Sequence, residues 1–187
     1  MRPITCVSLV SLALGLMLSP MAGRGAAVDR LSVEAGTGDN VDIVGISIGS
    51  ADWKRWSFDN DWSLSLYGKG KVALWQGREH DAENRHVVDF GAYPVLHLER
   101  STAGQVSPYF EASVGVNLLS KTQINDNRKF STAFQFGEFL GGGVAFGEKR
   151  QYELGLRVQH VSNGNIKFPN DGLTYGSLVF QYRLGAP

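Results

Sequence analysis

Apolar and polar residues alternate along most of this chain with a period of two. In the stretch 62–74, for example, Trp62, Leu64 and Leu66 are separated by Ser63 and Ser65. A period of two is typical of a β-strand, because successive side chains of a strand point to opposite faces of the sheet. After residue 28 no stretch keeps a helical period, so the sequence predicts an all-β fold.

The alternation divides into eight stretches separated by turn-forming residues. They cover residues 31–35, 44–48, 62–74, 87–96, 110–117, 134–146, 152–159 and 177–184. Several of them approach the ~9–11 residues that a tilted strand needs to cross a bilayer. An even number of strands lets an antiparallel sheet close on itself and leaves no free edge in the lipid. We therefore predict an eight-stranded antiparallel transmembrane β-barrel.

The two faces of these strands differ in chemistry. One face is apolar, whereas the other carries Asp89, Glu111, Glu153, Arg157 and Arg183. A water-soluble barrel turns its apolar face inward, but a membrane barrel turns it toward lipid and keeps paired charges in a narrow lumen. Because these charges can pair with one another inside, they favour the membrane barrel. A soluble β-sandwich and a soluble lipid-binding barrel stay open as alternatives.

The first 27 residues have the layout of a secretory signal peptide. Arg2 supplies the positive charge, residues 7–18 form an apolar run, and small residues at 25–27 suit a signal peptidase. The apolar run is too short to span a bilayer, which makes a retained anchor the weaker interpretation. We predict a cleaved signal peptide over 1–27 and one barrel domain over 28–187. The single cysteine, Cys6, lies in the signal, so the mature chain has no thiolate nucleophile.

The charge balance and the spacing of candidate ligands argue against several classes of function. Lys and Arg together number 18, as do Asp and Glu, so no nucleic-acid partner is expected. No cluster has metal-ligand spacing, and we expect neither a metal nor an organic cofactor.

With both termini periplasmic, residues 76–85, 119–132 and 163–173 become extracellular loops, and 100–105 and 147–150 become short turns. The segment 50–60, rich in Trp and Phe, suits an aromatic girdle at the membrane interface.

Two polar residues break the apolar face of the seventh stretch. Continuing the parity of Tyr152 and Val158 places His160 and Ser162 on the lipid side, near the extracellular end of the strand. Polar groups there cost free energy, so they call for a reason. Side chains at i and i+2 stand side by side, which lets a histidine nitrogen take the serine proton. The pattern predicts a Ser-His hydrolytic pair; alternatively, the strand ends before His160 and both residues lie in a loop.

The residues that follow carry a resemblance to a known family. The run HVSNGNIKFPNDG from His160 to Gly172 resembles the lipid A 3-O-deacylase family (PagL), which shares His-x-Ser-Asn followed by Pro-Asn-Asp-Gly. Residues 134–138 and 110–112 support the resemblance, which spans the mature chain and is strongest over its C-terminal half. It implies an outer-membrane β-barrel that hydrolyses the ester-linked acyl chain at position 3 of lipid A. The implied partners are lipid A, or lipopolysaccharide, and outer-membrane lipids, with a homodimer left open.

The resemblance also implies roles for individual residues. Ser162 would be the nucleophile and His160 the general base. Asn163 would contribute to the oxyanion hole, a role that suits a side-chain amide donor aimed at developing negative charge.

The chain departs from the family at the third member of the triad. The family has an acidic residue where this chain has Thr174, and a threonine offers no charge to an imidazolium. Thr174 is then a weaker orienter, or the pair works as a dyad, or another carboxylate substitutes. Glu138 is the candidate carboxylate, because it shares the lipid-facing parity of its strand. If Phe146 pairs with Tyr152, antiparallel counting places Glu138 opposite His160.

A function from a different class is a non-catalytic outer-membrane barrel with a structural or adhesion role. Such a barrel has no use for a histidine and a serine on its lipid face, so the His160 and Ser162 pair distinguishes the two functions.

Overall fold

The computed structural model describes residues 28–101 and 106–184, and the predicted signal peptide lies outside these residues. Every regular element in this part of the chain is a strand. It contains no helix that is long and apolar enough to cross a membrane. The strands are β1 (Val28–Gly38), β2 (Val41–Ser50), β3 (Lys54–Ser57), β4 (Trp62–Gly77), β5 (His86–Arg100), β6 (Val106–Leu119), β7 (Gln123–Ile124), β8 (Arg128–Lys129), β9 (Phe134–Phe146), β10 (Tyr152–Ser162) and β11 (Leu173–Arg183).

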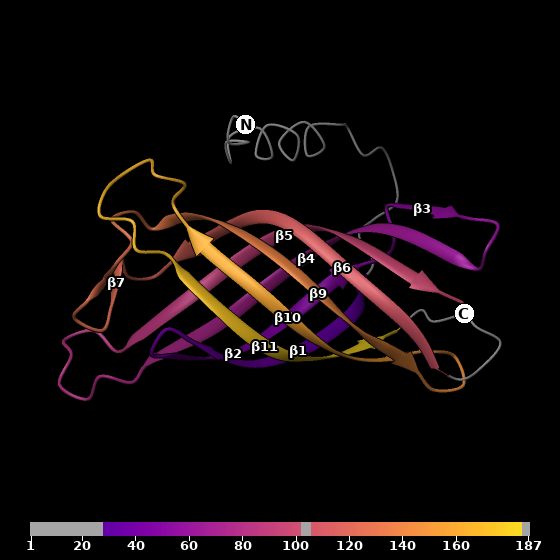
Figure 1. Ribbon diagram of the computed structural model, residues 1–187, viewed down its shortest axis with the longest axis horizontal. Coiled ribbons are helices and arrows are strands. Elements are labelled where there is room, and N and C mark those ends of the chain that lie inside the picture. The colour runs from indigo at the N-terminus through magenta and orange to yellow at the C-terminus, as the bar shows by residue number, and fades with distance from the viewer. Residues whose placement is uncertain (1–27, 102–105, 185–187) are drawn as a thin grey trace, which may run out of the picture.

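Eight of these strands form a closed antiparallel barrel (Figure 1). The strand order is β2-β1-β11-β10-β9-β6-β5-β4, and β2 pairs with β4 to close the ring. The predicted eight-stranded barrel is confirmed, with every predicted stretch inside one barrel strand or ending within one residue of it. One end of the barrel holds the first and last described residues, and we call it the terminus end. The other, the loop end, carries the connections 78–85, 120–133 and 163–172.

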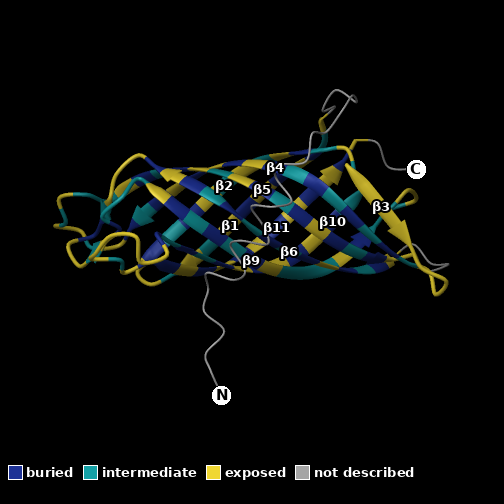
Figure 2. Cartoon of the chain, turned by 90° about the horizontal axis from the view of Figure 1, so that it is seen from above, coloured by how far each residue is buried: buried dark blue, intermediate teal, exposed yellow. Residues whose placement is uncertain are grey.

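Exposure alternates residue by residue along the wall, which gives the checkered pattern of Figure 2. In β11 the alternation of buried and exposed residues is unbroken from Leu173 to Arg183. Apolar side chains cover the outside; Leu140 and Leu156, for example, are each 70% exposed. A soluble protein rarely presents so much apolar surface. The predicted assignment of faces is confirmed, and the soluble β-sandwich is wrong.

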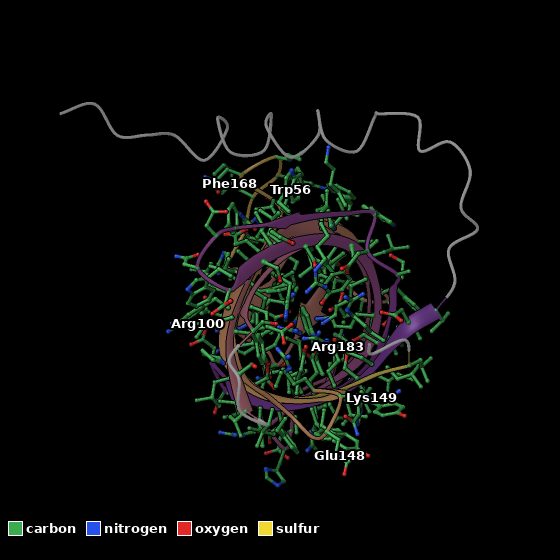
Figure 3. All side chains as sticks on the ribbon, turned by 90° about the vertical axis from the view of Figure 1, so that its right-hand side faces the viewer. Trp56, Arg100, Glu148, Lys149, Phe168 and Arg183 are labelled. Atoms are coloured by element: carbon green, nitrogen blue, oxygen red, sulfur yellow. The ribbon has the colours of Figure 1, made fainter. Side chains whose placement is uncertain are left out.

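The lumen is filled by charged side chains of both signs, and Figure 3 shows them inside the ring of strands, with Arg183 among them. Arg157 donates to Glu111 at 2.6 Å and to Glu34 at 3.0 Å, and Lys71 lies 3.3 Å from Asp89. Pairing of this kind offsets the free energy that charged side chains lose when they are removed from bulk water. The buried basic residues are Arg30, Lys69, Lys71, Arg157 and Arg183, and the buried acidic residues are Glu34, Asp89, Glu99, Glu111 and Glu153.

At the loop end the interior changes from charged to apolar. The short hairpin of β7 and β8 belongs to this end, and Phe130, next to β8, packs against Trp75 with ring centroids 5.9 Å apart. Trp75 also meets Tyr175 edge-on at 6.3 Å. This apolar core packs the loops against the barrel strands, so the loop end has a defined structure of its own. The core comprises Val41, Ile43, Ala73, Trp75, Val87, Leu119, Ile124, Phe130, Val161, Leu173 and Tyr175.

The aromatic segment 50–60 forms an additional short strand that the sequence did not predict. Strand β3 pairs with the first residues of β4, and Trp53 lies so close to Gly68 that an added Cβ would fall 2.3 Å from the indole. Asp52 anchors the segment through a 2.6 Å contact with Arg30. Burial alone would raise the pKa of the Asp52 carboxyl, but the Arg30 guanidinium and the Ser65 hydroxyl hold that pKa below its usual range.

Candidate active site on the outer wall

Strand β10 carries both predicted residues of the Ser-His pair. It runs without interruption from Tyr152 to Ser162, so the alternative in which the strand ends before His160 is wrong. His160 and Ser162 are both half-buried, while Val161 between them is fully buried inside the barrel. Side chains two residues apart on one strand share a face. The structure therefore places the imidazole and the hydroxyl side by side on the lipid-facing wall, at the loop end.

The neighbouring strands place two more polar residues beside the imidazole. His160 is paired with Thr174 of β11 on one side and with Glu138 of β9 on the other. The predicted register, in which Phe146 pairs with Tyr152, is confirmed. Both candidates for the third member of the triad thus flank the histidine.

Of the two flanking residues, Thr174 makes the contact. Its Oγ1 lies 2.7 Å from Nδ1 of His160, which is hydrogen-bond distance. Within residues 28–101 and 106–184, neither a hydrogen bond nor an ion pair joins Glu138 to His160. With Nδ1 engaged by Thr174, Nε2 is the free ring nitrogen, and among the described residues no hydrogen bond yet joins it to the Ser162 hydroxyl on the same face.

Asn163 has a different role from the one predicted. Its side chain is fully buried, and its amide nitrogen donates to the carbonyls of Phe130 at 2.8 Å and Lys167 at 2.6 Å. The strand alternation explains this, because the residue after the outward Ser162 points inward. The predicted oxyanion contribution from the Asn163 side-chain amide is therefore corrected: in this structure the amide holds the loop that follows the nucleophile.

Strand β8 contacts the C-terminal end of the loop between β10 and β11. The sequence did not predict this contact. The Arg128 guanidinium donates to the Gly172 carbonyl and lies 3.7 Å from the Asp39 carboxylate, which also accepts from the Thr174 amide at 3.4 Å. Gly172 in turn abuts the imidazole, since an added Cβ would fall 3.0 Å from Cε1 of His160. Arg128 and Asp39 thus hold the short segment that carries Thr174 against the histidine.

We expect Arg128→Gln to lower kcat roughly tenfold with little change in KM, because one charged hydrogen bond to the segment beside His160 is lost. Initial rates of hydrolysis of an acyl ester by the purified protein measure both constants. Arg78→Gln is the control, since Arg78 also pairs with an aspartate at the loop end, Asp42, but is more exposed than Arg128. Within the described part of the chain, Arg78 makes no hydrogen bond or ion pair with His160, Ser162 or Thr174. Equal losses in both variants would show that the effect is general loosening of the loops.

One buried cluster in the described residues has the composition of a metal site. His97, Glu99 and Glu153 lie together in the lumen, with ligand atoms within 4.8 Å of one another. Arg183 occupies the same place, donating to Glu99 at 2.7 Å and also to Glu153. A guanidinium already neutralises these carboxylates, so the cluster belongs to the charge network of the lumen.

A closed antiparallel barrel with an apolar outer wall and paired charges inside defines the class of integral outer-membrane β-barrel proteins. Within that class, residues 43–183 match the family model described as lipid A 3-O-deacylase (PagL). The chain belongs to the lipid A 3-O-deacylase (PagL) family, and it is a hydrolase of the outer membrane.

Individual relatives agree with this assignment. The lipid A deacylase PagL of Pseudomonas aeruginosa is 29% identical over 133 residues, which cover 71% of this chain and 73% of that protein. The lipid A deacylase PagL of Bordetella bronchiseptica is 29% identical over 154 residues, covering 82% of each chain. A crystal structure of the outer membrane enzyme PagL has a TM-score of 0.70 at 24% identity and covers 82% of this chain and 98% of that chain. This structural similarity supports the barrel fold.

Proposed function

We propose that this protein removes the ester-linked acyl chain at position 3 of lipid A, with Ser162 as nucleophile and His160 as general base. The observation that carries the proposal is the position of both side chains on the lipid-facing wall at the loop end of β10. Such a position costs free energy in a purely structural barrel. It suits an enzyme whose ester bond lies at the boundary between acyl chains and head group.

In the proposed reaction, Nε2 of His160 takes the proton of the Ser162 hydroxyl as Oγ attacks the acyl carbonyl carbon. The tetrahedral intermediate collapses, the sugar oxygen at position 3 leaves, and it receives the proton from the imidazolium. Water then attacks the acyl-serine, again with His160 as base, and releases the free fatty acid. Serine is regenerated, and no metal or cofactor takes part.

Thr174 is the proposed positioning residue for His160, because its hydroxyl is at hydrogen-bond distance from Nδ1. Fixing Nδ1 orients the ring so that Nε2 faces the serine. Glu138 is the second candidate, since it is the directly paired residue on β9. It needs a side-chain movement to reach the imidazole, whereas Thr174 needs none.

The site is assembled from a single chain, with His160 and Ser162 on β10 and Thr174 on β11. A homodimer is therefore not required for the proposed reaction. The loop end is the proposed extracellular end, which places the serine at the outer leaflet, where lipid A resides.

Mass spectrometry of lipid A from cells producing the intact protein or Ser162→Ala tests the proposal. We expect the intact protein to yield lipid A that lacks one 3-hydroxyacyl chain, and Ser162→Ala to leave lipid A unmodified, because removal of the nucleophile of a Ser-His pair costs several orders of magnitude in rate. Heat-dependent gel migration verifies that the variant is a folded barrel. Unmodified lipid A with both folded proteins would instead favour the structural or adhesion role.

A further inference from the structure

The tip of the loop between β10 and β11 combines two apolar side chains with one cation. Ile166 is 65% exposed and Phe168 is 71% exposed, and Lys167 between them is exposed as well. Figure 3 shows Phe168 outside the ring of strands, on the same flank of the barrel as Trp56. We call residues 166–168 the wedge. Apolar side chains that project from a barrel wall at the membrane boundary are stabilised when they enter lipid.

The wedge is attached to the residue that follows the proposed nucleophile. The Asn163 amide donates to the Lys167 carbonyl at 2.6 Å, and the Asn163 carbonyl accepts from the Ile166 amide at 3.2 Å. Asn170 closes the loop by accepting from the Asn163 backbone amide at 3.0 Å. These contacts fix the wedge backbone relative to Ser162, and the long Lys167 side chain extends from a defined point.

The charge of Lys167 is uncompensated in the described part of the chain. None of the ion pairs there includes Lys167, whereas two arginines at the same loop end are paired, Arg78 with Asp42 and Arg128 with Asp39. A lysine flanked by lipid-inserted side chains extends its ammonium group toward the head-group layer. In that layer an ammonium group has lipid anions as available partners.

We propose that Lys167 binds a phosphate monoester on the head group of the lipid substrate while its acyl ester lies at Ser162. This inference rests on the proposed function. The charge complementarity is direct, since lipid A carries phosphate on the sugars that bear its acyl chains and an ammonium is a strong phosphate partner. Ile166 and Phe168 would contact the neighbouring acyl chains, so the wedge recognises the two chemical parts of a phosphorylated glycolipid.

The experiment compares two substrates, bisphosphorylated lipid A and the same lipid A after phosphatase treatment, in detergent micelles with purified protein. We expect Lys167→Gln to lower kcat/KM about tenfold for the phosphorylated substrate, the size of one charged hydrogen bond. For the dephosphorylated substrate the change should stay within twofold. Lys167→Arg should retain activity on both. Lys149→Gln removes an exposed lysine from the terminus end (Figure 3) and should change neither rate.

Equal losses on the two substrates, or no loss on either, would overturn the phosphate contact. A binding measurement separates this proposal from the catalytic one. Dissociation constants of both lipids for folded Ser162→Ala protein, with and without Lys167→Gln, need no turnover. A weaker affinity limited to the phosphorylated lipid supports the contact even if the intact protein releases no fatty acid, an outcome that would reject the proposed reaction alone.

Discussion

Replacing Thr174 by glutamate is expected to raise kcat by about 10- to 100-fold. The Thr174 hydroxyl lies 2.7 Å from Nδ1 of His160. Because a hydroxyl both donates and accepts hydrogen bonds, it can bond to either tautomer of the neutral imidazole. When Thr174 donates to Nδ1, the proton sits on Nε2 and the ring cannot act as base. A carboxylate only accepts, so it enforces the tautomer with a free Nε2 and also stabilises the imidazolium. A charged hydrogen bond of about 1.5–3 kcal/mol corresponds to that range of rates.

Steady-state release of 3-hydroxy fatty acid from lipid A measures the effect. Thr174→Gln controls for size without charge and should not reproduce the gain, and Thr174→Val, which loses the hydrogen bond, should lower kcat roughly tenfold. Glu138→Gln decides between the two candidate partners. If Glu138→Gln removes most of the rate while Thr174→Val leaves it unchanged, the carboxylate of β9 holds His160 and the assignment to Thr174 is wrong.

Strand alternation accounts for most of what could be predicted here. The period of two predicted eight strands, and the charges on one face predicted which face meets lipid. The same parity placed His160 and Ser162 on the outer wall and Glu138 opposite His160, and the structure confirms each of these placements. These features are local or follow from counting along paired strands, so the sequence contains them.

The features that were missed depend on contacts between distant segments. Arg128 reaches Gly172 across 44 residues, and the Asn163 amide reaches Phe130 across 33 residues. Loop packing of this kind has no periodic signature. Asn163 is a different case, because the parity that placed Ser162 outward also places its neighbour inward. Applied one residue further, that rule would have predicted a buried structural amide in place of the oxyanion donor.

Breaking the charge network of the lumen is expected to have the largest effect on stability. Arg157 is 3% exposed and bonds both Glu111 and Glu34. Arg157→Met leaves carboxylates facing each other without their shared cation, and removing one partner of a buried pair costs about 3–5 kcal/mol. Urea unfolding of the barrel in phospholipid vesicles, followed by tryptophan fluorescence, measures the free energy of unfolding. Arg55→Gln, at the exposed pair with Asp52, should change it by less than about 1 kcal/mol.

The double variant Arg157→Met with Glu111→Gln tests whether charge or packing explains the loss. Neutralising Glu111 removes one uncompensated carboxylate, and Glu34 keeps Lys71 at 3.5 Å as a partner. We therefore expect the double variant to be more stable than Arg157→Met alone, since paired removal of buried charges is often tolerated. A loss in Arg157→Met no larger than in Arg55→Gln would contradict this prediction, because it would mean that Glu111 and Glu34 take up protons or are screened by water once the guanidinium is gone.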